Sequence, residues 1–261
     1  MEKNRDRSRL DASRFVAHRG YASKYPENTL LSMAKAVEAG AVYLECDVQL
    51  TADKVPVVHH DPDLRRSAGA EGCVMDLRLE ELSRHRFTEP GRLGDKFSNV
   101  GVTTLRDLAG LLLENPKVTL FVELKEESLE RFGTELMVER VMQAITPAID
   151  RCVAISFADA PLTAAAKSGW RRTGWVLRRF DDEHKARAEE LSPDYLFCNH
   201  KKIPPVPGGL WRGKWKWALY EITDARVAEE WFQLGADMVE TMDIGGMLDA
   251  FGLGKPKHEA R

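Results

Sequence analysis

The sequence has no long apolar run and no strong excess of charge of either sign. A run of about eighteen consecutive apolar residues, the minimum for a membrane-spanning helix, does not occur, so we expect no transmembrane segment. The 38 basic and 41 acidic residues give a formal net charge of -3, without the clustered basic excess of nucleic-acid-binding surfaces. The start, from Met1 to Arg14, is charged and has no apolar stretch, so no secretory signal is expected. Together these absences predict a cytoplasmic protein that binds no nucleic acid.

Cysteine is scarce, and short cofactor motifs are missing. The cysteines show no C-x-x-C spacing, which argues against a zinc ribbon or a redox dithiol; they are Cys46, Cys73, Cys152 and Cys198. All except Cys73 lie in apolar, strand-like runs, where a reduced thiol behaves as a small apolar side chain, so we expect free thiols. No G-x-G-x-x-G or Walker A motif follows a strand-like run, which removes the main reason to expect a nucleotide-binding sheet.

What the sequence does contain is a regular alternation of short apolar runs and helical patterns. Eight runs have the length and pattern of strands, over residues 14–18, 42–48, 118–125, 152–156, 173–177, 195–198, 216–221 and 236–241. Helices are expected over residues 28–40, 77–85, 104–112, 129–145, 160–167, 182–191 and 223–235, with Asn28 and Thr223 as N-caps of the first and last. Repeated βα units with short connections form a parallel sheet covered by helices. Eight units favour a closed (β/α)8 TIM barrel over an open sheet, as a single domain over residues 1–261.

One further apolar run, residues 55–60, follows the second predicted strand too closely for a parallel crossover. Such a crossover needs about a dozen residues, whereas residues 51–54 provide four, so we predict an antiparallel hairpin. Counting back across the turn places Glu45 opposite His60, to within one residue. Because side chains alternate along a strand, only one of the two adjacent histidines faces this side, and His59 is expected to be packed or solvated.

The ends of the predicted strands carry polar side chains. They are His18, Arg19, Glu45, Asp47, Glu123, Lys125, Ser156, Asn199, Glu221 and Glu240. In a TIM barrel these ends meet at one face, where active sites lie. Several carboxylates around one cavity call for a cation, and the oxygens of Glu45, Asp47 and Glu123 suit Mg²⁺ or Ca²⁺ better than Zn²⁺. The alternative is a polar mouth in which the acids form salt bridges with Arg19 and Lys125. The convergence of three acids with two histidines favours the cation site.

Five segments resemble the glycerophosphodiester phosphodiesterase (GDPD) family, in the family's order and with family-like spacing. They are Val16-Ala17-His18-Arg19-Gly20, Pro26-Glu27-Asn28-Thr29, Leu44 to Thr51, Val57 to Pro62 and Val122 to Lys125, with weaker echoes in Ile155-Ser156-Phe157 and Leu234 to Asp237. The resemblance extends over roughly residues 14–245. It implies a TIM barrel with a small insertion after the hairpin, here about residues 61–102.

The resemblance also implies a role for each matching polar residue. The ligands of one divalent cation, Mg²⁺ or Ca²⁺, correspond to Glu45, Asp47 and Glu123. The acid/base pair corresponds to His18 and His60. The phosphate contacts correspond to Arg19 and Lys125, and a further substrate contact or supporting residue to Glu27.

Two departures from the family pattern lie outside these positions. The eighth strand, which usually ends in Thr-Asp, ends here in Thr241-Met242 and is preceded by Glu240. A segment rich in proline and glycine replaces the helix expected between the sixth and seventh strands, and it ends in Trp211, Trp215 and Trp217. These tryptophans either contact a choline-type headgroup or a lipid tail, or pack a loop against the barrel, which is the commoner use of tryptophan.

The resemblance implies a divalent-metal-dependent phosphodiesterase that hydrolyses glycerophosphodiesters to glycerol 3-phosphate and an alcohol. A lysophospholipase D would use the same core with an apolar groove for an acyl chain. The alternative from another class is a barrel that binds a phosphate ligand or a partner protein without catalysis, although such a barrel has no need of the metal and histidine side chains. The sequence defines neither the preferred alcohol, nor which histidine is the acid, nor the oligomeric state.

Overall fold

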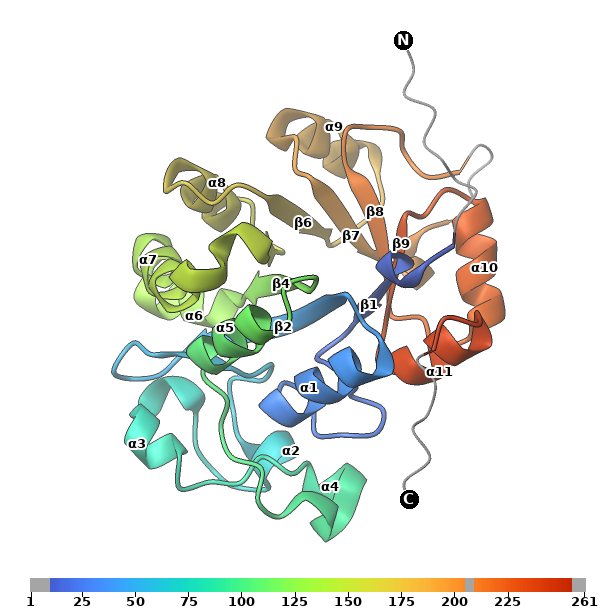
Figure 1. The fold of residues 1–261 in the computed structure, drawn as a ribbon. Coiled ribbons are helices and arrows are strands. Elements are labelled where there is room, and N and C mark those ends of the chain that lie inside the picture. Colours follow the sequence, from blue (N-terminus) through green and yellow to red (C-terminus); the bar gives the residue numbers. More distant parts are fainter. Residues whose placement is uncertain (1–9, 205–208, 255–261) are drawn as a thin grey trace.

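In the described part of the chain, residues 10–204 and 209–254 of the computed structural model, eight parallel strands close into a barrel. The strands are β1 (Phe15–Ala17), β2 (Tyr43–Leu50), β4 (Thr119–Leu124), β5 (Cys152–Ser156), β6 (Thr173–Leu177), β7 (Tyr195–Asn199), β8 (Lys216–Tyr220) and β9 (Met238–Thr241). Neighbouring strands pair in the order β1-β9-β8-β7-β6-β5-β4-β2, and the pairing of β1 with β2 closes the ring (Figure 1). The predicted TIM barrel is confirmed.

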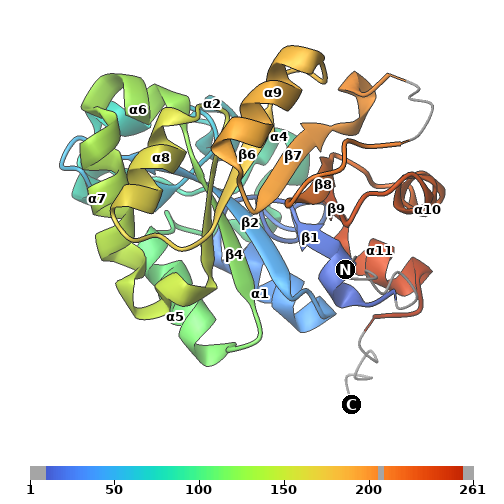
Figure 2. The same ribbon diagram turned by 90° about the horizontal axis from the view of Figure 1, so that it is seen from above.

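Helices cover the outer face of the ring (Figure 2). The principal ones are α1 (Leu30–Ala39), α5 (Leu105–Glu114), α7 (Thr134–Ile145), α8 (Ala160–Lys167), α9 (Asp182–Leu191), α10 (Ala225–Gln233) and α11 (Ile244–Ala250). Outward-facing strand residues such as Leu44, Val122 and Leu196 are buried in one continuous apolar layer with these helices. Each βα unit therefore buries its apolar side against the next, which is why the alternation in the sequence specifies a closed barrel.

The first helix begins one residue later than predicted. Its N-cap is Thr29, whose hydroxyl accepts a hydrogen bond from the Ser32 backbone in a capping box. Asn28, the predicted N-cap, instead adopts a left-handed backbone with φ of 54°. Its side-chain amide donates to Asp47 at 2.8 Å. The residue type that usually caps helices is used here to hold a strand-end carboxylate.

Three other helical features differ from the predictions. The predicted helix over 129–145 is two helices, α6 (Glu126–Phe132) and α7, because Gly133 with φ of 87° separates them. Helix α10 is capped by Asp224 rather than by Thr223. Helix α11, capped by the side chain of Asp243, was not predicted.

The predicted hairpin is present as β2 and β3 (Pro56–Val58), paired antiparallel. Leu50 lies opposite Pro56, one residue from the predicted register and within its margin. Beyond the last strand pair, the backbone N–H of His59 donates to the Asp47 carbonyl at 2.9 Å. The hairpin therefore carries the two adjacent histidines to the acidic end of β2.

Between β3 and α5 the chain forms a small lobe outside the ring of strands, coloured cyan in Figure 1. It contains the short helices α2 (Arg65–Ala68), α3 (Leu79–Leu82) and α4 (Pro90–Leu93). The lobe has an apolar core of its own, made of Val57, Leu64, Val74, Leu82 and Phe87. It is the segment predicted as an insertion, and it adjoins the barrel at the histidine end of the hairpin.

The interior of the barrel is filled with apolar side chains. They are Val16, Phe121, Val153, Ile155, Val176, Tyr195, Phe197, Ala218 and Met238. The Phe121 ring makes edge contacts, 5.0 Å between ring centres, with both Tyr195 and Phe197. Burying one such large side chain contributes about 1.5–3 kcal/mol. This packing forms a rigid floor beneath the carboxyl ends of the strands.

Two sequence expectations concern apolar runs and cysteines. Within the described ranges, none of the helices combines the length and apolar content that crossing a bilayer requires. All four cysteines are free thiols, as predicted, and all except Cys73 are buried.

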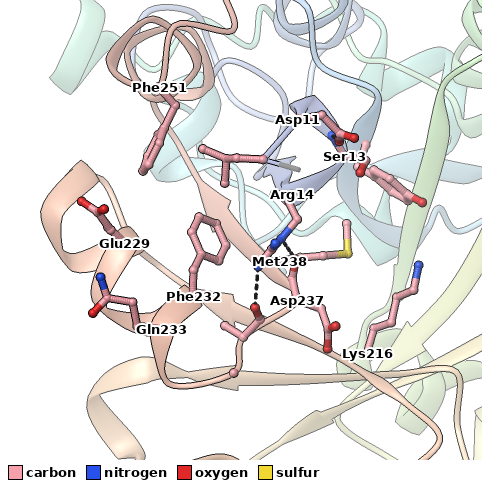
Figure 3. Close-up of a pocket in the computed structure, with 14 residues that line it drawn as sticks. Asp11, Ser13, Arg14, Lys216, Glu229, Phe232, Gln233, Asp237, Met238 and Phe251 are labelled. Atoms are coloured by element: carbon pink, nitrogen blue, oxygen red, sulfur yellow. Dashed lines mark hydrogen bonds between the residues drawn. The ribbon is translucent and has the colours of Figure 1, made fainter. Parts of the chain in front are cut away.

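A cavity of about 840 Å³ opens at the amino ends of the strands (Figure 3). Arg14 lies across it, with its guanidinium 4.3 Å from the centre of the Phe232 ring and donating to the Ala236 carbonyl at 2.8 Å. In TIM barrels this end contributes to stability, whereas catalysis occurs at the carboxyl ends of the strands. An active site is therefore expected at the opposite end of the barrel.

Candidate active site

A cavity of about 160 Å³ lies at the carboxyl ends of the strands. It is lined by His18, Arg19, Glu45, His60, Glu123, Lys125, Ile155, Phe157, Val176, Phe197, Tyr220 and Glu240. The charged residues come from β2, β4, β9 and the segments that follow β1, β3 and β4. The apolar residues come from β5 to β8. The cavity thus has a charged half and a largely apolar half.

Three carboxylates converge in the charged half. Glu45 and Asp47 alternate with apolar residues along β2, and Asp47 lies beside Glu123 in the parallel register of β2 and β4. One carboxylate oxygen from each of the three lies within 4.8 Å of the others. Glu45 and Asp47 are 2% and 1% exposed. The shared strand face expected from the sequence therefore brings these oxygens together.

Arg19 and Lys125 pair with part of this negative charge. The Arg19 guanidinium lies 3.0 Å from Asp47 Oδ2 and 2.9 Å from Glu27 Oε1. The Lys125 ammonium lies 3.2 Å from Glu123 Oε1 and 3.7 Å from Asp47 Oδ1. The salt bridges with Arg19 and Lys125 that the alternative interpretation, a polar barrel mouth, predicted are therefore present. They centre on Asp47, which both cations contact, and leave negative charge elsewhere in the cavity.

The buried carboxylates repel one another. Burial, followed by the charges of Asp47 and Glu240, raises the pKa of Glu45 well above its ordinary value. Burial and Asp47 also raise the pKa of Glu123 to about 7. Burial pushes the pKa of Asp47 upward too, but the Arg19 guanidinium and other cationic neighbours hold it below its usual range. A divalent cation would stabilise all three groups as carboxylates, and a donor set made only of oxygens fits Mg²⁺ or Ca²⁺.

The turn after β1 brings Arg19 against β2. Arg19 and Gly20 both have left-handed backbones, with φ of 55° and 80°. Glycine is required at position 20 on a second count, because a Cβ there would lie 2.5 Å from Ser32 Oγ. The turn directs the Arg19 backbone N–H to Glu45 Oε2 at 3.1 Å. A non-glycine residue in this conformation costs about 1 kcal/mol or more, and such residues cluster at functional sites.

His18 lies at the end of β1 between two acids. Its Nε2 is 3.8 Å from Glu45 Oε2, and its Nδ1 is 3.8 Å from Glu221 Oε2. Both distances exceed hydrogen-bond length. Burial, followed by the charge of Arg19, lowers the pKa of His18 to about 3. The imidazole is therefore neutral in the metal-free protein at neutral pH.

The adjacent histidines of the hairpin point in opposite directions. His60 lines the cavity, and its Nδ1 lies 2.6 Å from Asp61 Oδ1. The His59 ring is buried, with one nitrogen 2.6 Å from the Asp61 carbonyl and the other 2.7 Å from Ser67 Oγ. His60 therefore reaches the cavity and His59 is packed, as predicted, but strand parity is not the reason. The observed register continues to His59 opposite Asp47, and His60 enters the cavity from the turn beyond the end of β3.

Glu27 lies behind the cavity lining. Its Oε1 bridges Arg19 at 2.9 Å and Arg66 of the lobe at 2.7 Å. Arg66 also donates to Asp61 Oδ2 at 2.7 Å. These contacts link the lobe to Arg19 through Glu27 and to His60 through Asp61. Of the two roles implied for Glu27, the geometry matches that of a residue supporting Arg19.

Comparison with known proteins identifies the family. The family model described as "Glycerophosphoryl diester phosphodiesterase family" matches residues 18–171. The chain belongs to this family. The matched region contains every GDPD site position carried over from the sequence, from His18 to Lys125.

Curated relatives agree with the GDPD assignment. "Glycerophosphodiester phosphodiesterase 1" of Bos taurus is 34% identical over 125 residues, which are 48% of this chain and 37% of that protein. An uncharacterised protein of Mycobacterium tuberculosis is 30% identical over 236 residues, which are 87% of this chain and 70% of that protein. The matches to the first curated relatives span between 35% and 52% of those proteins' own length.

Solved GDPD structures share the fold. A phosphodiesterase of Oleispira antarctica, in complex with the product sn-glycerol-3-phosphate, superposes with a TM-score of 0.79 at 22% identity, covering 93% of this chain and all of that one. A putative glycerophosphoryl diester phosphodiesterase of Silicibacter pomeroyi gives 0.76 at 22% identity, covering 92% and 94%. These similarities extend over the barrel beyond the region that the GDPD family model matches.

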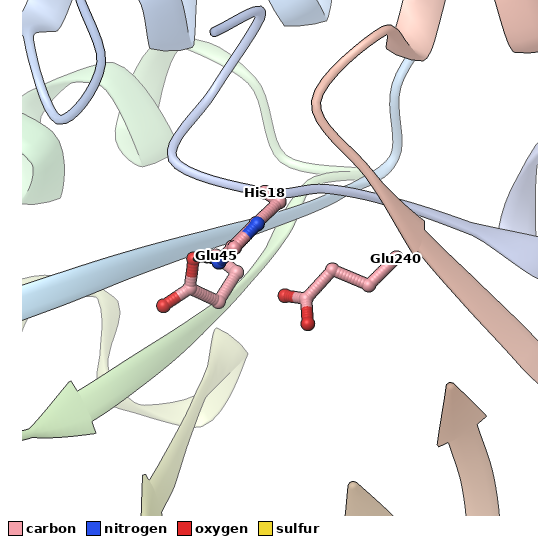
Figure 4. Close-up of side chains that lie close together, drawn as sticks. All are labelled: His18, Glu45 and Glu240. Carbon is pink, nitrogen blue, oxygen red and sulfur yellow. Dashed lines mark ion pairs between the residues drawn. The ribbon is translucent and has the colours of Figure 1, made fainter. Parts of the chain in front are cut away.

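Glu240 is a cavity residue that the sequence reasoning left without a role. It lies near the end of β9, and its carboxylate points toward His18 and Glu45 (Figure 4). One donor atom from each of these three residues lies within 4.8 Å of the others. A signal was available, because Glu240 is two residues after Met238, which fills the barrel interior, and side chains two apart share a face.

The tryptophan-rich segment packs against the barrel. Trp215 and Trp217 are each 3% exposed. The Trp217 indole donates to the Trp211 carbonyl at 2.9 Å, and the Trp211 ring stacks on Phe180 at 4.0 Å. The packing interpretation is therefore confirmed for the two buried tryptophans. The proline- and glycine-rich stretch before them falls partly on residues 205–208, outside the described residues.

Proposed function

We propose that this protein hydrolyses glycerophosphodiesters to glycerol 3-phosphate and an alcohol with one divalent cation, Mg²⁺ or Ca²⁺. One observation carries the proposal. In a member of the GDPD family, three carboxylates, two histidines, an arginine and a lysine surround a single cavity at the catalytic end of a TIM barrel. The cytoplasmic location expected from the sequence stays a prediction.

The cation would be held by Glu45, Asp47 and Glu123. Their oxygens are close enough to share an ion, and their mutual repulsion gives that ion a stabilising role. When bound, a divalent cation supplies positive charge beside the phosphate oxygens. The salt bridges of Asp47 with Arg19 and Lys125 keep this carboxylate ionised and oriented.

Arg19 and Lys125 would bind the phosphate of the substrate. A phosphodiester is anionic, and nucleophilic attack adds charge to its non-bridging oxygens, which positive groups in a partly dehydrated cavity stabilise. Arg19 presents a planar fork suited to two oxygens, whereas Lys125 acts as a point charge. Glu27 orients the Arg19 guanidinium from behind at 2.9 Å.

His18 and His60 would share the proton transfers. One histidine takes a proton from the nucleophile, which is a water or a neighbouring substrate hydroxyl. The other histidine donates a proton to the departing alkoxide. His60 has a carboxylate partner, Asp61, on Nδ1 at 2.6 Å. This pairing fixes the orientation of the ring.

A product assay tests the proposal. Glycerol 3-phosphate release from glycerophosphocholine should require Mg²⁺ or Ca²⁺, stop with a chelator and return when the ion is restored. Equal product with and without chelator would refute the metal requirement. Absence of product under all conditions would favour a non-catalytic barrel that binds a phosphate ligand.

The same assay assigns the acid and the base. A substrate with a p-nitrophenol leaving group needs little protonation, so it should restore activity to the variant that lacks the general acid. His18→Ala and His60→Ala are compared on glycerophosphocholine and on the p-nitrophenyl ester. Restoration of both variants, or of neither, would contradict a division of labour between the two histidines.

The apolar half of the cavity favours one second candidate, a lysophospholipase D. Ile155, Phe157, Val176 and Phe197 line this half, and an acyl chain could enter along them. Turnover of lysophosphatidylcholine compared with glycerophosphocholine separates the two substrates. Cleavage of the lysophospholipid alone would select the second candidate.

A further inference from the structure

Glu240 is a buried acid that the proposed mechanism does not use. It is 3% exposed, and its Oε1 has no hydrogen-bond partner among the described residues. An ionised carboxylate that is buried without a partner is costly, so native proteins seldom keep one without a use. Burial and the charges of Glu123 and Asp47 also raise the pKa of Glu240.

The position of Glu240 relates it to the proposed cation site. It faces the cavity from β9, where it is the register partner of Val16 on β1. Glu45 belongs to two groups of donor atoms, each within 4.8 Å, one with Asp47 and Glu123 and one with His18 and Glu240. An ion bound at Glu45 would therefore be close to donor groups from Asp47 and Glu123 and also to Glu240.

The balance of charge points the same way. Three acids that line the cavity, Glu45, Glu123 and Glu240, and the adjoining Asp47 lie together with the cations Arg19 and Lys125. Both cations pair with Asp47, Glu123 or Glu27, while Oε1 of Glu240 lacks a described partner. Glu27 is also paired with Arg66, and if those two charges balance, the four acids and two cations leave two negative charges, which one divalent ion matches.

We propose that Glu240 is a fourth carboxylate donor of the cation site and binds the same ion as Glu45 from the β9 side. The proposal rests on the cation site of the proposed function and adds a residue to it. Hard divalent cations accept six or more oxygen donors, and additional charged donors raise their affinity. A separate ion held by His18, Glu45 and Glu240 would take His18 away from proton transfer, so we favour the shared ion.

Mn²⁺ binding tests this directly, because Mn²⁺ prefers the same oxygen donors and its free form is counted by electron paramagnetic resonance. Titrations compare the wild type, Glu240→Gln and the control Glu221→Gln, which removes a more exposed carboxylate from the same mouth. We expect one ion per chain in all three proteins. Glu240→Gln should bind it about tenfold more weakly, and Glu221→Gln within about threefold of the wild type.

The outcomes distinguish failure of the Glu240 inference from failure of the proposed function. Unchanged Mn²⁺ affinity in Glu240→Gln would overturn the fourth donor alone, and so would two ions in the wild type with one in the variant. A wild type that binds no Mn²⁺ would overturn the cation site as well. Thermal unfolding in chelator checks folding, and Glu240→Gln should unfold at a higher temperature than the wild type because a buried repulsion is removed.

Discussion

The two halves of the barrel mouth are built from the same βα units but carry opposite chemistry. The carboxyl ends of β2, β4 and β9 carry acids that face inward, and β1 is followed directly by His18 and Arg19. The ends of β5 to β8 present mainly apolar side chains to the cavity. The charged half stores repulsion among buried carboxylates. The other half continues the packed interior, with Phe197 touching Phe121. The difference shows that stability and chemistry are divided between sectors of one ring.

The largest effect is expected from a single acid of the charged half. Glu45→Gln should lower kcat/KM for glycerol 3-phosphate release by a factor of about 10³ or more, because cation stabilisation of phosphoryl charge is worth several kcal/mol. The metal-free variant should be at least as stable as the wild type, because a repulsive charge is gone. Near-wild-type activity of Glu45→Gln, or a lower Tm than the wild type in chelator, would contradict the view that the charged half serves catalysis and lowers stability.

The two adjacent histidines sharpen the contrast at the hairpin. His60→Ala should lower kcat by a factor of about 10² to 10⁴, the usual contribution of a proton-transfer group. His59→Ala should retain most of the rate but lose about 1–3 kcal/mol of stability, because it leaves the buried Ser67 hydroxyl unpaired. Steady-state kinetics and urea unfolding of both variants provide the comparison. Similar kinetic losses in both would contradict the assignment of His60, rather than His59, to the site.

Truncating side chains in the apolar half of the cavity should lower the free energy of unfolding. Phe197→Ala removes a ring that is 1% exposed and should lower the free energy of unfolding by about 3–5 kcal/mol. Phe157→Ala, which truncates a partly buried residue of the same cavity half, should cost less. Chemical denaturation measures both. An equal loss for Phe157→Ala and Phe197→Ala would contradict the view that the packed barrel interior contributes more to stability than the partly buried side chains at its edge.

The smallest effect concerns the link between the lobe and His60. Burial opposes ionisation of Asp61, but hydrogen bonds from Arg66 and His60 prevail and lower its pKa to about 2. The ordinary pKa is about 3.9, so ionised Asp61 stabilises the fold above about pH 4, and this contribution is lost as the pH falls toward 2. Asp61→Asn should therefore be less stable by about 1–2 kcal/mol at pH 7, and the gap should narrow below pH 4. Urea unfolding at several pH values checks this, and a gap that is constant with pH would exclude the linkage.

Much of the fold and part of the site could be predicted because they follow from periodicity and connection length. The alternation of strands and helices led to the barrel, and the four-residue connector after β2 permitted only a hairpin. Parity along β2 placed Glu45 and Asp47 on one face, whereas His60 reaches the cavity from the turn beyond β3, which parity alone does not predict. The roles of these residues as ligands and as acid and base stay predictions, as does a single domain over the whole chain.

Other features were beyond such reasoning because they depend on contacts between distant segments. Asn28 was predicted to cap a helix, yet its amide binds Asp47 across 19 positions of sequence. The arrangement of Arg66 between Glu27 and Asp61 depends on how the lobe folds back on the barrel. No local pattern encodes either contact.

Local chemistry of the chain, namely its alternating apolar positions and short connections, specifies the order of the strands, the hairpin and the face on which each strand-end acid lies. Closure of the ring, which pairs β1 with both β2 and β9, is a tertiary event. It brings Glu240 from the last strand to within reach of Glu45 and His18 from the first two. The reason is geometric: parity along one strand is a local property, whereas the distance between donor atoms on different strands is set only when the barrel closes.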